Sequence, residues 1–577
     1  MPIYMPGDSV PAAPAAKWDP QMGNYSMPIS CTDVPEAQRT FDLGLNLAFN
    51  FNQGEARSAF TRCAAAAPRC AMCYWGLAYA HAPFLNHPIK DAPDVAAGII
   101  AASTAARLAK RHAAAGGGVA APPSHGPLAT APYTYTAKEV GLIDTMGVRY
   151  PSTATGNQTA ANLAYERALS ALHTSMPDDD DVSTFLAEAS LLLQCIPGGY
   201  RFYHPDGTPT ARTARTDALL RSVFARSSHA HPYAHHLYIH LAEPSRPSVN
   251  ASHGAGRSLP SAAALAAAFA GTDAQHLIHM PTHAYLRSGQ YAKTVPLNAA
   301  AHTSDERYLE HGRLPYGPAH NVAFALYGAC MAGMRAAAYR TANTLSAIYA
   351  ASPDRGDGPG PDIGWNLRLT TPLRFGAWHD VIRSDPAQPR PWPYSVVVRE
   401  YANGTALLKL GRVAEANQRL RSLEEELPRV PPSQAKYAQV ARLCLLGALQ
   451  ASGAAGGSAG GAASANLTAA ADSLATAASE QNSWMYDEPP KWHMPVRQCL
   501  GTVQLRAGQP KAACATFAAD LRAFPRNAYS LYGMVRCMRA QPAAFSPDEV
   551  EEVAAQMRTA WKDADVPLTS ACLAFEA

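Results

Sequence analysis

The stretch RAGQPKAACATFAADLRAFP, residues 506–525, decides the fold class. Gly508 is followed five residues on by the small Ala513, then by Phe517, and the stretch ends at Pro525. Glycine and proline punctuate local structure, so they mark the turn before a helix and the end of that helix. Ala513 and Phe517 stand four residues apart and share one face. The pattern predicts a helix that packs closely against a neighbour through a small residue.

The same pattern recurs along the chain. EARSAFTRCAAAAP (55–68) places Ala56, Phe60, Cys63 and Pro68 in the same order, and weaker copies with a turn glycine and a small residue five on occur at 287–301, 331–342 and 409–420. Recurrence of this kind is the signature of tetratricopeptide repeats (TPRs), each a pair of helices. Strand patterns are nearly absent. We therefore predict an all-α, TPR-type solenoid: a right-handed superhelix with a concave groove.

Low-complexity stretches rich in Ala, Gly, Ser and Pro interrupt the predicted array, and we interpret them as mobile surface loops. The segment 244–262 is similar to these and is predicted to be a further insertion. The expected organisation is an N-terminal extension (1–35), repeats (36–112), a flexible insertion (113–135), central repeats with a histidine-rich groove (136–350), a loop (351–365), repeats (366–451), a loop (452–465) and C-terminal repeats (466–577).

The bulk composition of the 577-residue chain excludes several classes of partner. Charged residues make up only 16%, and the net charge of +3 has no basic run behind it, so nothing indicates nucleic acid. No apolar stretch approaches the roughly 18–20 residues of a membrane span. Phosphate-binding glycine loops and the nucleophile elbow of serine hydrolases are also absent, which disfavours nucleotide and serine-hydrolase functions.

The eleven cysteines are dispersed, and we expect most of them to be buried thiols. Cys63 and Cys73 are the pair to test for a disulfide. The N-terminus lacks the basic start and apolar core of a secretory signal. Five N-x-[ST] sequons nevertheless favour a secretory route slightly over the cytoplasm: they occur at Asn24, Asn157, Asn250, Asn403 and Asn466.

Two histidine-rich stretches carry the chemistry. HHLYIHLAE contains His236, His240 and Glu243, and QHLIHMPTHAY contains His276, His279 and His283. Because successive helical residues turn by about 100°, each trio lies on one helix face. Counting from the turn glycines assigns these residues, together with His320, to the positions of the first helix of a repeat that line the groove. We therefore expect all seven side chains to converge.

Pro281 lies inside the second trio and is expected to kink its helix near Leu277, because proline removes a backbone hydrogen bond. The kink either breaks the stripe or gives His276 and His279 a different direction from His283.

Six imidazoles and a carboxylate at one place favour a divalent transition metal, namely Cu, Zn or Fe, over simple packing. Protonated imidazoles would repel one another, whereas buried neutral ones each need hydrogen-bond partners. Neutral imidazole is a good ligand for these ions, and either one ion or two could be held. The alternatives are that the histidines line a groove that binds an acidic or aromatic peptide, another small ligand or a protein partner without catalysis, or that they form a buried polar network.

Nine ordered stretches carry a resemblance to a known family: FDLGLNLAFNFNQGEARSAF, CAMCYWGLAYAHAPFLN, HPDGTP, HLYIHLAE, HLIHMPTHAYLRSGQY, DERYLE, PAHN, YDEPPKWHMPVR and LRAFPRNAYSLYGM. Over most of its length the chain resembles a group of uncharacterised tetratricopeptide-repeat proteins. The resemblance implies an α-solenoid but no particular reaction. It also implies that the seven residues above, together with Tyr486, Asp487 and Glu488, are hallmark positions. Where members usually have histidine, this chain has Gln53.

The role of Asp487 and Glu488 is open between further metal ligands, an acid–base pair and the capping of a helix that begins near Pro489, and we favour capping. For the whole chain we carry two functions forward. The first is a metalloprotein, with an oxidative or hydrolytic metalloenzyme as its catalytic form. The second is a non-catalytic TPR scaffold for a peptide or protein partner.

Overall fold

The computed structural model describes residues 18–115, 133–151, 157–196, 199–226, 231–351, 360–384, 392–454 and 466–576. The predicted insertions at 113–135 and 452–465 lie largely outside these ranges. Of the predicted loop 351–365, residues 352–359 lie outside them, whereas residues 360–365 are helical and form the start of α16 (Gly360–Arg374) instead of a loop. The segment 244–262 lies inside them, and the loop predicted there is wrong for its second part. That part forms the short helix η1 (Gly254–Ser258) and the start of α10, where Ala255 and Ser258 are buried.

Helices form nearly all of the regular structure. The first half contains α1 (Pro35–Phe49), α2 (Gln53–Ala66), α3 (Ala71–His81), α4 (Ala92–Ala115), α5 (Ala137–Arg149), α6 (Gln158–Ser175), α7 (Asp180–Leu192), α8 (Ala211–Arg226), α9 (Pro232–Ala242), α10 (Leu259–Ala268), α11 (Gln275–His279), α12 (Pro281–Arg287) and α13 (Thr294–Glu310). A two-residue antiparallel hairpin, β1 (Cys195–Ile196) and β2 (Gly199–Tyr200), lies between α7 and α8.

The second half continues with α14 (Pro318–Met331), α15 (Arg335–Ala351), α16 (Gly360–Arg374), α17 (Trp378–Arg383), α18 (Pro393–Lys409), α19 (Val413–Glu426), α20 (Pro432–Ala451), α21 (Leu467–Ser483), α22 (Val496–Arg506), α23 (Pro510–Ala523), α24 (Ala528–Arg539) and α25 (Pro547–Ala560). Further short 3₁₀ turns are η2 (Tyr291–Lys293), η3 (Leu427–Arg429) and η4 (Leu573–Phe575).

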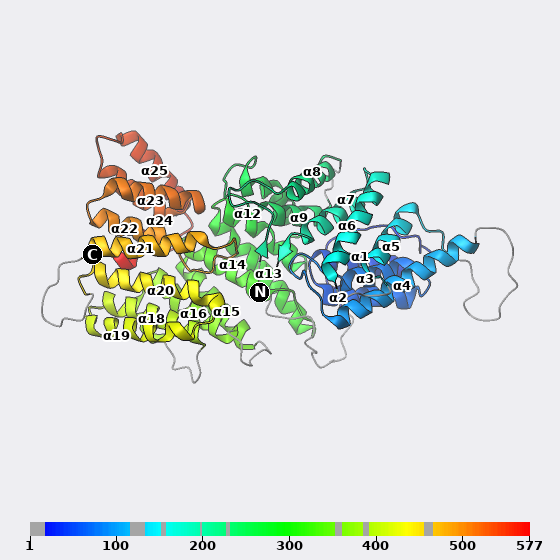
Figure 1. Ribbon diagram of the computed structural model, residues 1–577, viewed down its shortest axis with the longest axis horizontal. Helices are drawn as coiled ribbons and strands as arrows, with labels where there is room; N and C mark the ends of the chain where they lie inside the picture. The colour runs from blue at the N-terminus through cyan, green and yellow to red at the C-terminus, as the bar shows by residue number, and fades with distance from the viewer. Residues whose placement is uncertain are drawn as a thin grey trace.

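Consecutive helices pack against each other as hairpins, for example α1 on α2, α18 on α19 and α22 on α23, and the hairpins stack side by side (Figure 1). The predicted turn glycines Gly289, Gly333, Gly411 and Gly508 all adopt positive φ, at 75°, 73°, 77° and 69°. Glycine takes this conformation without the steric cost that a Cβ brings. The all-α, TPR-type helical-repeat solenoid is therefore confirmed.

The repeat pattern has a direct packing cause. Phe517 of α23 lies between Gly501 of α22 and Gly533 of α24, and an added Cβ on either glycine would come within 2.5 Å or 2.3 Å of its ring. At the other end of the chain Phe60 lies in the same way against Gly44 of α1 and Gly76 of α3. One aromatic ring thus fills the space between three helices only because two of them carry no side chain there.

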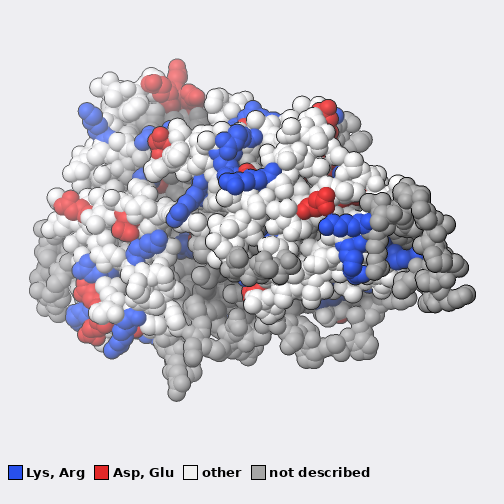
Figure 2. Space-filling view, turned by 45° about the vertical axis from the view of Figure 1, so that its right-hand side comes forward, with Lys and Arg blue, Asp and Glu red and all other residues white. Residues whose placement is uncertain are grey.

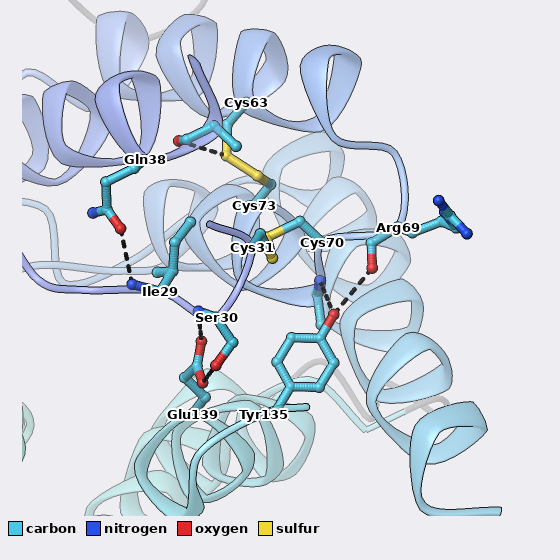
Figure 3. The surroundings of a disulfide bond; sticks show 12 residues. Ile29, Ser30, Cys31, Gln38, Cys63, Arg69, Cys70, Cys73, Tyr135 and Glu139 are labelled. Atoms are coloured by element: carbon cyan, nitrogen blue, oxygen red, sulfur yellow. Dashed lines mark hydrogen bonds between the residues drawn. A yellow bond between two sulfur atoms is a disulfide. The ribbon is translucent and has the colours of Figure 1, made fainter. Parts of the chain in front are cut away.

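Four disulfides tie neighbouring segments together, and they join Cys31 to Cys70, Cys63 to Cys73, Cys499 to Cys572 and Cys514 to Cys537. The pair singled out for testing, Cys63 and Cys73, is bonded, whereas the expectation that most cysteines are thiols is wrong. Cys70 at the N-cap of α3 bonds to Cys31, and Cys73 three residues further on bonds to Cys63 of α2 (Figure 3). Cys195, Cys330 and Cys444 remain as thiols.

Disulfides at this density are typical of proteins that fold in an oxidising compartment. Four of the five sequon asparagines are also exposed, and only Asn403, within α18, is buried. On the face shown in Figure 2, basic and acidic side chains are interspersed over a largely uncharged surface. Among the described residues, no helix combines the length and apolar character needed to span a membrane.

Candidate metal centre

Four helices in the middle of the chain bring the predicted ligands together. His236 and His240 lie on α9, with Glu243 at its C-terminal cap, and α11 carries His276 and His279. His283 lies on α12 and His320 near the start of α14. Figure 1 shows α9, α12 and α14 near the centre of the molecule. The predicted convergence of the seven residues is what the structure shows.

Pro281 interrupts the helix as predicted, but the break falls at Met280, between α11 and α12, rather than near Leu277. Proline at the first position of α12 needs no hydrogen-bond acceptor, so a new helix begins there at little cost. The break does not separate the ligands, because His279 before it and His283 after it have their Nε2 atoms 2.9 Å apart.

The histidines form two sets of three. In the first histidine set, His236, His240 and His276, the Nε2 atoms of His236 and His240 are 3.1 Å apart. In the second histidine set, His279 and His283 form the close pair and His320 is the third member. Within each set the three potential ligand atoms lie within 4.8 Å of one another.

The two sets adjoin. The ring centroids of His240 and His283 are 5.6 Å apart, and so are those of His276 and His279. Glu243 connects them, because its Oε1 lies 3.0 Å from Nδ1 of His240 and its Oε2 lies 2.5 Å from Nδ1 of His283. One buried carboxylate therefore orients a histidine of each set.

The Nδ1 atoms of the four paired histidines all face hydrogen-bond acceptors. Nδ1 of His236 donates to the Phe49 carbonyl (2.8 Å), and Nδ1 of His279 donates to Oδ1 of Asn298 (2.6 Å). The Asn298 oxygen is fixed as an acceptor because its amide nitrogen donates to Thr294 O. Nδ1 of His240 and of His283 face carboxylates, and Glu488 adds a second one 2.9 Å from His283.

This arrangement sets the tautomers. An imidazole whose proton is on Nδ1 has a lone pair on Nε2. When both imidazoles of a close pair are neutral, two Nε2 lone pairs face each other at 3.1 Å or 2.9 Å. Two acceptors at that distance repel unless a proton or a metal ion lies between them. Outer carboxylate or carbonyl partners that fix Nδ1–H are also what metal-binding histidines usually have.

The pKa values of the clustered histidines are shifted in opposite directions, depending on whether burial or a nearby carboxylate has the larger effect. Burial lowers the pKa of His236, His276 and His279 well below the usual range, and the neighbouring histidines add to the effect. Burial also lowers the pKa of His240, against the opposing charge of Glu243. At His283 burial is outweighed by the carboxylates of Glu243 and Glu488, which raise its pKa to about 10.

His276 has no hydrogen-bond partner of its own. Its side chain is 1% exposed, and neither ring nitrogen contacts a donor or acceptor among the described residues. Leaving a buried polar group unsatisfied costs about 1–3 kcal/mol. A metal ion on the first histidine set would remove the part of this cost that belongs to the lone pair, because the ion bonds directly to that ring nitrogen.

The site is enclosed rather than open. His236, His240, Glu243, His276, His279 and His283 are each 3% exposed or less, and only His320 is partly exposed. The expectation that these residues line an open groove therefore needs correction. Aromatic rings fill the space around them. Phe51 packs on His236 and His276 at centroid distances of 4.3 Å and 5.1 Å, and Phe324 packs on His283 at 4.4 Å.

The remaining candidate residues, Tyr486, Asp487, Glu488 and Gln53, lie in different surroundings. Glu488 is buried beside His283, whereas Asp487 pairs with Lys491 at the surface. Neither residue caps a helix, because the next helix along the chain, α22, begins only at Val496. The capping interpretation is therefore wrong. The Tyr486 ring is stacked under the guanidinium of Arg287. Nε of that guanidinium lies 3.7 Å from the Glu488 carboxylate. Gln53 starts α2 and donates to Ala48 O; no contact with the seven residues is found in the part of the chain that the structure describes.

Sequence reasoning missed three functional partners: the Phe49 carbonyl, Phe51 and Asn298. Phe51 has a left-handed φ of 59°, which is rare outside glycine and places its ring against the first histidine set. The resemblance pointed at this segment through Gln53, two residues along, but not at the ring. Asn298 carries no local signal, because only the packing of α13 on α11 brings it to His279.

No protein family matches the chain, and no curated protein matches it. Among solved structures, the human IFIT1 dimer with m7Gppp-AAAA is 10% identical, with 91% of this chain and 90% of that chain covered and a TM-score of 0.29. The APC/C hetero-tetramer Cut9-Hcn1 is also 10% identical, with 92% and 89% covered and the same TM-score of 0.29. TM-scores this low carry no argument, so the repeat fold rests on the helix pairs and turn glycines themselves.

Proposed function

We propose that this protein is a metalloprotein that binds a transition metal, namely copper, zinc or iron, on its buried histidine cluster. The observation that carries the proposal is the pair of Nε2 atoms that face each other in each set, because the Nδ1 atoms of the same four histidines are directed at Phe49, Asn298 and the two carboxylates. The orphaned imidazole of His276 supports it independently.

The donor set fits these ions. Imidazole nitrogen suits Zn, Cu and Fe, and no thiolate lies among the candidate ligands. Three protein ligands leave a coordination position at which a bound ion polarises water or a carbonyl, and a redox-active ion also exchanges electrons there. The residues themselves hold the ion, fix the Nδ1 protons and exclude bulk water. A catalytic form of the protein would thus be an oxidative or hydrolytic metalloenzyme.

The alternative function is a non-catalytic scaffold that binds a peptide or protein partner. Helical-repeat solenoids present extended surfaces to partners. A surface hollow of about 280 Å³ lies between α15, α16 and α17 and includes Tyr339, Arg368 and Asp380. It lies away from the histidines, which are enclosed and offer a peptide no room. The scaffold function therefore fits the outer surface of the solenoid rather than the cluster.

The test is metal analysis of protein purified without a histidine tag. We expect close to stoichiometric Cu, Zn or Fe, lost in a His240→Ala, His279→Ala double variant. Helical circular dichroism shows whether that variant folds. His276→Phe is a second variant that sacrifices no hydrogen bond. A metal-free protein that takes up none of the three metals, and whose stability does not change on chelation, would overturn the proposal.

A further inference from the structure

The two histidine sets share no residue. His236, His240 and His276 come from α9 and α11, whereas His279, His283 and His320 come from α11, α12 and α14. Each set independently offers three imidazole nitrogens within 4.8 Å of one another. A third grouping, Glu243 with His283 and Glu488, uses the Nδ1 side of His283 and therefore leaves Nε2 to the second histidine set.

We propose that the cluster holds two copper ions, one on each histidine set. This inference rests on the proposed metal-binding function and deepens it by giving the number and identity of the ions.

Two ions explain the geometry better than one. Close contacts between two Nε2 atoms occur at two separate places, between His236 and His240 at 3.1 Å and between His279 and His283 at 2.9 Å. An ion in one set leaves the two Nε2 atoms of the other pair facing each other without an ion. Six imidazoles also exceed the three or four protein ligands that a single such ion takes in most protein sites. His276 and His320 then complete the two sets as third ligands.

The position of the carboxylates favours copper. Glu243 and Glu488 contact the Nδ1 side of the histidines, so neither set includes a carboxylate ligand. Non-haem iron sites commonly do include one. The fixed negative charge is also limited, because Arg287 lies 3.7 Å from Glu488 and offsets one of the two buried carboxylates, Glu243 and Glu488. A buried site with little countercharge suits a monovalent ion better than a divalent one, and copper alone among the three candidates has a common monovalent state.

Copper counting on single-set variants tests the inference. The untagged full chain is loaded with copper, freed of excess metal, and its copper content is measured by mass spectrometry. The wild type should hold two ions per chain. His276→Phe should retain one, since phenylalanine preserves the stack on Phe51 and removes no hydrogen bond. His320→Phe should also retain one, and the double variant none.

His235→Phe is the matched control. His235 is a buried histidine on α9 next to His236, but it bonds to Ser261 and belongs to neither set. It should keep both ions. Circular dichroism verifies that each variant folds. If a variant does not fold, the electron paramagnetic resonance of the copper-loaded wild type decides, after oxidation of all its copper to copper(II). Two adjacent ions should couple and give far less signal than the copper content requires.

The outcomes separate the two proposals. A wild type that holds no copper, zinc or iron overturns both of them. One ion per chain, lost in either single variant, overturns the pair but leaves metal binding intact. Two ions with full, uncoupled signal intensity also overturn the pair as an adjacent centre. Two zinc ions in preference to copper overturn the choice of metal.

Discussion

The two histidine sets have the same plan but different third members. Each contains a close pair of imidazoles whose Nδ1 atoms are anchored from outside. In the first set the third member, His276, is buried and has no partner, whereas in the second set His320 is partly exposed and reaches water. The first set therefore has no way to satisfy its third imidazole except a ligand. The second set is the side on which the cluster comes nearest to the solvent.

The largest expected effect is that of removing the metal. An ion present at about 1,000 times its dissociation constant stabilises the folded state by about 4 kcal/mol. Chelation should therefore lower the thermal midpoint clearly, and amide hydrogen exchange should rise more in α9 and α11 than in α14. Hydrogen–deuterium exchange by mass spectrometry measures this asymmetry. Equal exposure of the three helices would contradict the contrast between His276 and His320.

Glu243→Gln should weaken both sets together, because one carboxylate orients His240 and His283. Loss of an outer partner of a metal-binding histidine typically costs about 10- to 100-fold in affinity. Competition with a calibrated chelator measures the metal affinity of each set. Binding to the first histidine set is the first binding step, and binding to the second histidine set is the second. Glu306→Gln, which removes a surface carboxylate that contacts only His302, is the control and should change neither step. A change confined to one step would show that Glu243 serves a single set.

Glu488→Gln should separate the sets. The Glu488 carboxylate contacts His283 but no member of the first set, so only the second binding step should weaken, again by about 10- to 100-fold at most. Asp487→Asn is the matched control one residue away, since Asp487 pairs with Lys491 at the surface. Weakening of the first step to the same extent would show that the two sets are not independent.

The smallest effect is expected from Phe51→Leu. The Phe51 ring packs on His236 and His276 only in the first set, and an apolar replacement of similar volume usually costs less than about 1.5 kcal/mol. The first binding step should weaken a few-fold and the second should not change. The chelator competition reports both. An effect on the second step would show that Phe51 shapes the whole cluster.

The two sets also show which contacts can be predicted from residue spacing in the sequence. The pairs at spacing i, i+4 in HHLYIH and HMPTH are visible in the sequence, because helical geometry alone brings their nitrogens together. The groups from other segments that contact the Nδ1 atoms cannot be predicted from this spacing. Asn298, Glu488 and the Phe49 carbonyl come from segments remote from the histidines they contact. No periodicity links such positions.

The sequence by itself indicated the repeat fold, the helices that carry the candidate ligands, and Cys63 with Cys73 as the cysteine pair to test. These follow from interactions within one helix or between consecutive ones, where glycine, phenylalanine and proline at fixed spacing leave few alternatives. Only the tertiary structure decided the rest. It closed the groove over the histidines, placed Glu488 and not Asp487 beside His283, paired the other cysteines, and divided six imidazoles into two sets. Each of these depends on which distant helices pack together, and that is set by the summed burial of the whole chain rather than by any short pattern.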